Sequence, residues 1–262
     1  QKSRQELLNY GTLIESLGGK YVTAGDVGMQ VADMDVLGET SQFVTGRSPE
    51  KGGVGDSGIL TALGIWQGIQ ACVEYLSGSN DLSRVTVGVI GAGKVGGRLI
   101  GHLIESGGAK VIAMDPVASV RTDLSATYPD LVFVDSFAEM LNFGPTIISP
   151  NAMGGFITPE LVPQLTAVGV SLVCGGANNQ LATPDVGDLL AAAGILYAPD
   201  FMVNCGGVIQ VAEELVGANV ERAREQVMRV YPTTLTVLES AAQAGITPVA
   251  AAEAAAWAII NA

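Results

Sequence analysis

The spacing of apolar residues separates an amino-terminal helical part of the chain from a long alternation of strands and helices. Apolar residues recur at helical spacing over 4–17, two glycines then end the predicted helix, and a short strand is predicted at 21–23. A glycine-rich stretch at 46–58 predicts a loop that serves as a hinge between two domains. The helical pattern resumes over 62–76.

From residue 85 onward, short apolar runs alternate with helical stretches. Each run has the length and the aliphatic composition of a buried parallel strand. The predicted strands are 85–90, 110–114, 131–134, 146–149, 170–174 and 195–197. This alternation predicts an open α/β sheet. From residue 208 the pattern is helical to the end, with breaks near Pro232 and Gly245.

Several predicted helices share one start signal, a threonine followed by proline, at Thr158, Thr183 and Thr247. A threonine hydroxyl can accept a hydrogen bond from the first helical turn, and proline at the first helical position lacks the N–H that would remain unpaired there. We therefore predict that each threonine caps a helix that begins at the next residue.

Composition excludes several classes of protein. Hydrophobic residues make up 48% and charged residues 15% of the 262 residues, which is too apolar for a disordered chain. The sequence has no uncharged apolar run of the ~18 residues that a membrane-spanning helix needs. The net charge of −13 disfavours binding to nucleic acid or to an anionic membrane. Cys72, Cys174 and Cys205 are scattered and His102 is the only histidine, which disfavours structural zinc and fits a reducing, cytoplasmic compartment.

A glycine-rich turn follows the first predicted strand of the alternating region. Gly91, Gly93 and Gly96 form a GxGxxG pattern between the strand at 85–90 and a helix predicted to begin at residue 95, and Asp115 ends the next strand. The first glycine permits a tight turn, the second lets a pyrophosphate approach the backbone, and the third allows helix and strand to pack closely. A carboxylate at Asp115 would accept hydrogen bonds from a ribose and repel a 2′-phosphate, which favours NAD over NADP. The alternative is an ordinary glycine turn beside a surface aspartate.

A second group of candidate residues surrounds Asp26, which lies in a glycine-flanked loop after the strand at 21–23. Asp26, Asp33 and Asp35 could hold a divalent metal. However, the last two lie where a helix is predicted to begin, and acidic side chains complement the helix dipole there. The sequence therefore favours a general acid or base at Asp26 and no metal site.

Three loops rich in asparagine and glycine follow predicted strands, at 150–155, 175–180 and 199–207. Ligands bind outside the carboxyl ends of strands in open α/β sheets, so these loops favour a ligand-binding cleft. Asparagine is also an ordinary turn residue, which leaves a purely structural interpretation open.

These segments together resemble the amino-acid dehydrogenase family, in particular its leucine, valine and phenylalanine dehydrogenase branch. The segments that carry the resemblance are TAGDVG and VADMD within 23–35, VTGRSPEKGG at 44–53, TALG at 61–64, GAGKVGG at 91–97, NAMGG at 151–155, GGANNQL at 175–181 and YAPDFMVNCGG at 197–207. The resemblance implies a Rossmann-like, doubly wound, mostly parallel sheet at 56–212. It also implies a remnant of a substrate and catalytic domain with the hinge at 1–55, and carboxyl-terminal helices at 213–262 that pack back towards that domain.

The implied activity is NAD-dependent oxidative deamination of an apolar L-amino acid to a 2-oxo acid, ammonia and NADH, by a cytoplasmic homo-oligomer. The resemblance places Asp26 at the catalytic aspartate, which handles protons at the substrate amine, and Asn178 beside both substrate and cofactor. The implied cofactor-binding positions are Ser57, Thr61, Gly91, Ala92, Gly93, Lys94, Val95, Gly96, Gly97, Asp115, Ala152, Met153, Gly176, Ala177, Asn178 and Asn204.

Members of the family carry two functional lysines, one holding the substrate carboxylate and one activating water, in a domain before the segment that matches 1–17. Lys20 falls at an ordinary junction of the family pattern, so we do not expect it to replace either lysine. The first residue is Gln1 rather than Met, and we expect the sequence to begin inside a longer dehydrogenase. The alternative is a naturally short NAD-binding relative that has lost deamination and acts as a regulatory or partner module.

Overall fold

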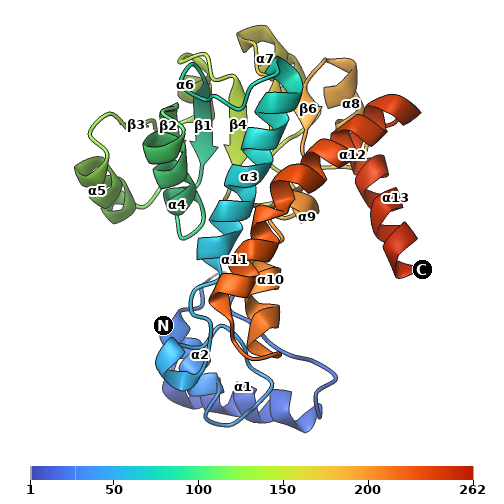
Figure 1. Cartoon of the computed structure of the whole chain (residues 1–262). Helices are drawn as coiled ribbons and strands as arrows, with labels where there is room; N and C mark the ends of the chain where they lie inside the picture. The colour runs from blue at the N-terminus through green and yellow to red at the C-terminus, as the bar shows by residue number, and fades with distance from the viewer. Residues whose placement is uncertain (1, 27, 262) are drawn as a thin grey trace. The chain divides into compact units, whose positions relative to one another are not determined.

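The computed structural model describes residues 2–26 and 28–261, and the chain forms two compact units. The first unit consists of Gln1–Leu60 and Gly206–Val227, and the second of Thr61–Cys205 and Met228–Ala262. Each unit therefore combines segments that are far apart in the sequence, as the colours of Figure 1 show.

The described part of the second unit contains a six-stranded parallel sheet in the order β3-β2-β1-β4-β5-β6. Its strands are β1 (Thr86–Ile90), β2 (Lys110–Met114), β3 (Val132–Phe133), β4 (Ile147–Pro150), β5 (Leu172–Val173) and β6 (Leu196–Tyr197). The chain starts in the middle of the sheet, builds outward to β3 and returns to place β4 on the other side of β1 (Figure 1). This doubly wound order confirms the predicted fold class, and each strand predicted from residue 85 onward is present.

Helices precede, connect and follow the strands of the second unit. They are α3 (Gly58–Ser77, which begins in the first unit), α4 (Gly96–Gly101) with a π-helical turn (His102–Ser106), α5 (Ala118–Thr127), α6 (Phe137–Leu141), α7 (Leu161–Val168), α8 (Val186–Ala192), α9 (Asp200–Val203), α12 (Val230–Ala244) and α13 (Pro248–Ile260). The breaks predicted near Pro232 and Gly245 correspond to the start and the end of α12.

Both faces of the sheet are covered. On one face, Met140 of α6 and Leu165 of α7 belong to the same buried cluster as Ile148 of β4. On the other face, α3 packs so closely that a Cβ built at Gly68 would lie 2.5 Å from Val203 of α9. The central strands are continuous runs of buried residues, and successive side chains of a strand point to opposite faces, so each run supplies both apolar faces at once.

The first unit is built from short helices around a small core. They are α1 (Arg4–Ser16), α2 (Val31–Leu37), a 3₁₀ turn (Pro49–Lys51), α10 (Gly206–Glu214) and α11 (Val220–Met228). Leu7, Met34 and Val44 are buried together. The strand predicted at 21–23 is wrong, because only an isolated bridge joins Thr23 to Val44. A strand needs neighbours along its length, and the glycines that follow Thr23 lead the chain into a loop instead.

The three threonine caps have different outcomes. Thr247 caps α13 as predicted, since its hydroxyl accepts from the N–H of Ala250 at 3.3 Å. At the other two sites the prediction is wrong, because α7 and α8 begin three residues after Thr158 and Thr183. There the threonine carbonyls accept hydrogen bonds in a separate turn that precedes the helix, and the hydroxyls do not cap it.

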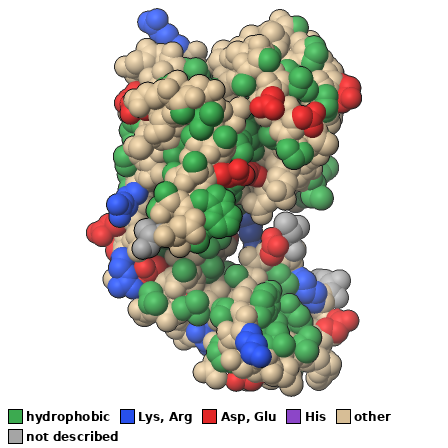
Figure 2. Space-filling model, turned by 90° about the vertical axis from the view of Figure 1, so that its right-hand side faces the viewer, with side chains coloured by type: hydrophobic (Ala, Val, Ile, Leu, Met, Phe, Trp, Pro, Cys, Tyr) green, Lys and Arg blue, Asp and Glu red, His purple; other side chains and the backbone are tan. Residues whose placement is uncertain are grey.

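The second half of α13 is exposed. Trp257 and Ile259 are 60% and 79% exposed, whereas Ala251 and Ala252 in its first half are buried. Figure 2 looks towards the side on which α13 lies in Figure 1 and shows apolar side chains interspersed with acidic ones on this face. Among the described residues, none of the helices is long and apolar enough to cross a membrane.

Candidate functional site

The reversal of strand order beside β1 brings several loops to one edge of the sheet. The connections after β1 and β4 leave in opposite directions, and open α/β sheets bind ligands at such a switch point. The N–H of Asn151 donates to the carbonyl of Ile90 at 2.7 Å, which joins the ends of the two strands. The loop after β5 is joined in turn, because the N–H of Ala177 donates to the carbonyl of Pro150 at 3.0 Å.

Each glycine of the GxGxxG turn meets a different geometric requirement. Gly91 has φ +86°, and a Cβ there would lie 2.8 Å from the Cβ of Ala152. A Cβ at Gly96 would lie 1.9 Å from the carbonyl oxygen of Gly91, so helix and strand could not pack as they do. A Cβ at Gly93 would meet no described atom within 4 Å. The backbone at Gly93 is therefore open to a ligand, as a pyrophosphate requires.

Asp115 follows β2 and lies beside this turn. Its side chain is buried, and one carboxylate oxygen accepts from the N–H of Ala92 at 2.8 Å. The other oxygen accepts from the N–H of Val117 at 2.8 Å. A carboxylate offers about four acceptor positions, so these two bonds leave capacity for ribose hydroxyls. The remaining acceptor positions of Asp115 and the open backbone at Gly93 together fit a dinucleotide.

Asn151 connects the loops after β4 and β5. Its Oδ1 accepts from the N–H of Gly176 at 2.9 Å, and its Nδ2 donates to the carbonyl of Ser149 at 2.9 Å. The neighbouring Met153 is 74% exposed at the same edge of the sheet. Sequence reasoning singled out the loop of Asn151 but assigned this residue no role.

The loop after β5 is also held by α9 and the residue after it. The carboxylate of Asp200 accepts from the N–H of Asn179 and, at 2.9 Å, from the N–H of Phe201. The Nδ2 of Asn204 donates to the Oδ1 of Asn178 at 2.6 Å. The structure therefore brings Asn178 and Asn204 into direct contact.

In the first unit, Asp26 is exposed in a loop that is closed by a bond from the N–H of Met29 to the carbonyl of Asp26, at 2.9 Å. Asp33 accepts from the N–H of Gln30 at 2.9 Å and so caps α2. Asp35 accepts from a backbone N–H at 2.8 Å in the segment that follows α2. The two acids thus stabilise local backbone, and among the residues that the structure describes no group of three His, Cys, Asp or Glu could hold a metal ion.

Comparison with known proteins identifies the family. A family model described as Glutamate/Leucine/Phenylalanine/Valine dehydrogenase matches residues 117–258. The chain is 47% identical over 255 residues to valine dehydrogenase of Streptomyces albus, a match that covers 96% of this chain and 68% of the relative. The chain belongs to this dehydrogenase family.

Two further relatives support the same assignment. Leucine dehydrogenase of Geobacillus stearothermophilus is 39% identical over 226 residues, which cover 85% of this chain and 59% of the relative. The crystal structure of L-tryptophan dehydrogenase from Nostoc punctiforme matches with a TM-score of 0.79 at 30% identity, covering 100% of this chain and 73% of that one. These findings confirm the resemblance to the leucine and valine branch and make the chain an oxidoreductase of the amino-acid dehydrogenase type.

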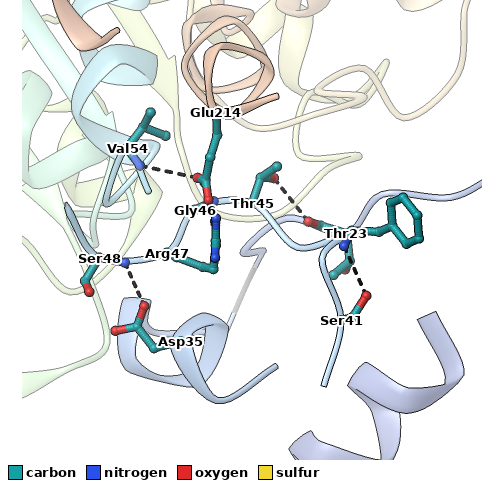
Figure 3. A network of polar contacts seen from close by, with 10 residues as sticks. Thr23, Asp35, Ser41, Thr45, Gly46, Arg47, Ser48, Val54 and Glu214 are labelled. Atoms are coloured by element: carbon teal, nitrogen blue, oxygen red, sulfur yellow. Dashed lines mark hydrogen bonds and ion pairs between the residues drawn. The ribbon is translucent and has the colours of Figure 1, made fainter. Parts of the chain in front are cut away.

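A buried carboxylate organises the segment at 46–60 of this dehydrogenase (Figure 3). Glu214 of α10, whose side chain is 2% exposed, accepts from the N–H of Gly46 at 2.7 Å and from the Nε of Arg47 at 2.8 Å. It also accepts from the N–H of Val54 at 3.3 Å. One side chain therefore fixes the two ends of a loop.

Gln210, one helical turn before Glu214, holds the rest of the segment. Its Nε2 donates to the carbonyls of Val54 at 2.8 Å and Asp56 at 3.3 Å, and its Oε1 accepts from the N–H of Leu60 at 3.4 Å. Ser57 lies inside the segment that these bonds fix. Sequence reasoning missed both side chains, since their only signal is the i and i+4 spacing of two polar residues in a helix that also carries Glu213.

The cysteines near this edge of the sheet lack the environment of a nucleophile. Hydrogen bonding to the thiol of Cys72 and burial raise the pKa of Cys174, and burial raises the pKa of Cys205. A raised pKa keeps both thiols protonated at neutral pH, so Cys174 and Cys205 act as small apolar groups.

Proposed function

We propose that this chain binds NAD at the carboxyl edge of its sheet and takes part in the oxidative deamination of an apolar L-amino acid. The observation that carries the proposal is the open backbone at Gly93 beside the buried carboxylate of Asp115. N–H groups of a glycine turn suit a pyrophosphate, and the carboxylate suits ribose hydroxyls. The relatives named for valine, leucine and L-tryptophan support the class of substrate.

The choice of NAD over NADP rests on the charge of Asp115. A 2′-phosphate would meet a carboxylate that the N–H groups of Ala92 and Val117 hold in place. Repulsion between the phosphate and the carboxylate disfavours NADP, whereas a ribose hydroxyl can donate to the same carboxylate.

The chemistry that NAD supplies when bound is the acceptance of a hydride from the Cα of the amino acid. Asp26 is proposed to exchange protons with the substrate amine and with the water that hydrolyses the imine. A cation is also needed to hold the substrate carboxylate. We assign neither that role nor the activation of water to Lys20, which lies in the turn after α1.

Thermal unfolding of the purified chain tests the cofactor. NAD is expected to raise the Tm, because a ligand at 100 times its Kd stabilises a fold by about 2.7 kcal/mol, and NADP is expected to raise it much less. Asp115→Asn keeps an acceptor oxygen but removes the charge. The Tm increase caused by NADP should therefore come closer to the increase caused by NAD. Equal stabilisation of the unchanged chain by NAD and NADP would contradict the role of Asp115.

A further inference from the structure

Two carboxamides meet at the end of β5, and their contacts determine which atoms they present. The Nδ2 of Asn204 donates to the Oδ1 of Asn178 at 2.6 Å and also to the carbonyl oxygen of Gly176 at 3.2 Å. Asn178 is exposed, whereas Asn204 is partly buried. The pair lies among the loops that surround the proposed cofactor site.

The backbone carbonyl fixes both amide orientations in series. A carbonyl oxygen can only accept, so the group of Asn204 that faces Gly176 must be its NH₂. That NH₂ also faces Asn178, so Asn178 must turn its oxygen towards it. The NH₂ of Asn178 is consequently turned away from Asn204, and the outward group of this side chain is a donor.

The backbone under Asn178 is held independently of this pair. The next residue, Asn179, has φ +53°, an uncommon conformation for a residue other than glycine, and its N–H donates to Asp200. Its carbonyl accepts from the N–H of Gly155 at 2.7 Å. A loop fixed from two sides leaves the side-chain torsions of Asn178 as the main remaining freedom, and Asn204 restricts them.

We propose that Asn204 is a positioning residue that acts through Asn178, so that the NH₂ of Asn178 donates to the carboxamide oxygen of the nicotinamide. This inference rests on the proposed function. A doubly wound sheet binds one half of a dinucleotide on each side of the switch point. Asp115 after β2 is assigned to the adenosine half, which leaves the loops after β4, β5 and β6 for the nicotinamide half.

Calorimetric titration with NAD and with ADP-ribose, which lacks nicotinamide, tests the inference without measuring turnover. Asn178→Ala should weaken NAD binding about tenfold, the effect of losing one hydrogen bond. Asn204→Ala should weaken it about threefold, since it only frees a side chain that must be ordered again. The double variant should bind NAD no more weakly than Asn178→Ala, because Asn204 is proposed to affect NAD only by orienting the side chain that Asn178→Ala removes. Affinity for ADP-ribose should stay within about twofold in all variants.

Three outcomes overturn the proposal, and they are distinguishable. Additive losses in the double variant would show that Asn204 touches the ligand itself. An equal loss of ADP-ribose binding would show that the substitutions disturb the loop as a whole. Failure of the unchanged chain to bind NAD would reject the proposed function together with the inference. Asn142→Ala, an exposed asparagine after α6 and before β4, is the matched control and should change neither affinity.

Discussion

The glycine turn at 91–97 and the segment at 46–60 both carry residues that the family resemblance places at the cofactor, but different contacts hold them. In the turn, Gly96 packs on Gly91 and Asp115 bonds to the backbone of the turn from the end of the next strand. The segment at 46–60 depends on side chains of α10 that lie 150 to 168 residues later in the chain.

Because different contacts hold the two regions, substitutions in them should have different effects, on ligand binding in one region and on folding in the other. A substitution at Gly93, in the open part of the turn, would meet the proposed cofactor before it met other parts of the protein. A change in α10 instead releases backbone groups of a distant loop, and a buried group without its partner costs more than the bond itself contributed. We therefore expect substitutions in the glycine turn of the second unit to lower the affinity for the proposed cofactor. Substitutions in α10 of the first unit should instead lower the stability of the fold.

The largest expected effect separates catalysis from cofactor binding. Asp26→Asn should lower amino-acid deamination about 100-fold or more, as expected for a general acid or base, while NAD affinity stays unchanged. The measurement uses a chimera that joins this chain to the part of the Streptomyces albus valine dehydrogenase outside the match, because the match covers 68% of that relative. NADH formation is followed with L-valine, L-leucine, L-phenylalanine and L-tryptophan.

Lys20→Ala in the same chimera is the control and should leave turnover unchanged. A chimera in which Asp26→Asn retains full activity would remove Asp26 from the mechanism. A loss of NAD affinity equal to the loss of turnover would show that the substitution acts on the cofactor instead.

Glu214→Gln should weaken the hydrogen bonds that hold the segment at 46–60 against α10. The amide has one acceptor oxygen in place of two and presents an NH₂ to donors, while Arg47 loses its counter-charge. We expect a loss of about 2–3 kcal/mol in the free energy of unfolding, less than for a fully buried pair because the Arg47 side chain is 26% exposed. Urea denaturation measures it, and the exposed Glu221→Gln on α11 is the control. A loss below that of the control variant would show that Glu214 does not hold the segment.

The same contrast explains how much could be predicted from the sequence. The strands and the glycine turn follow from local periodicity and from a motif whose glycines each have a geometric reason. The caps at Thr158 and Thr183 failed because a proline turn can precede a helix as readily as begin it. Gln210 and Glu214 could not be found, since nothing in the local sequence indicates which distant backbone a polar side chain will meet.

Two glycines of the turn form a matched pair that sharpens the distinction between fold and binding. Gly96→Ala places a methyl group 1.9 Å from the carbonyl of Gly91, and we expect a loss of about 1–3 kcal/mol in stability. Gly93→Ala points into open space, so its stability should be unchanged while its NAD affinity falls. Urea denaturation and calorimetry together measure both. If both variants lost the same amount of stability and of NAD affinity, Gly96 would not be specific to packing and Gly93 would not be specific to ligand binding.

The smallest expected effect concerns the carboxylate next to Glu214 in α10. Glu213 is bound by the guanidinium of Arg222 at 2.5 Å, and this contact lowers the pKa of Glu213 below its ordinary value of 4.5. Because the folded pKa is the lower one, the unfolded chain takes up more protons as the pH falls, so the contribution of Glu213 to stability is complete above 4.5 and is lost below it.

Arg222→Gln should therefore lower the Tm at pH 7 by a small amount that shrinks as the pH falls from 5 to 3.5, measured by scanning calorimetry. Arg224→Gln on the same helix removes an equal charge from an exposed position and should show no such pH dependence. The comparison isolates the contact from the net charge of −13, because both variants change that charge equally. A Tm difference for Arg222→Gln that is as large at pH 3.5 as at pH 7 would mean that packing of the arginine stem, and not its charge, connects α10 to α11.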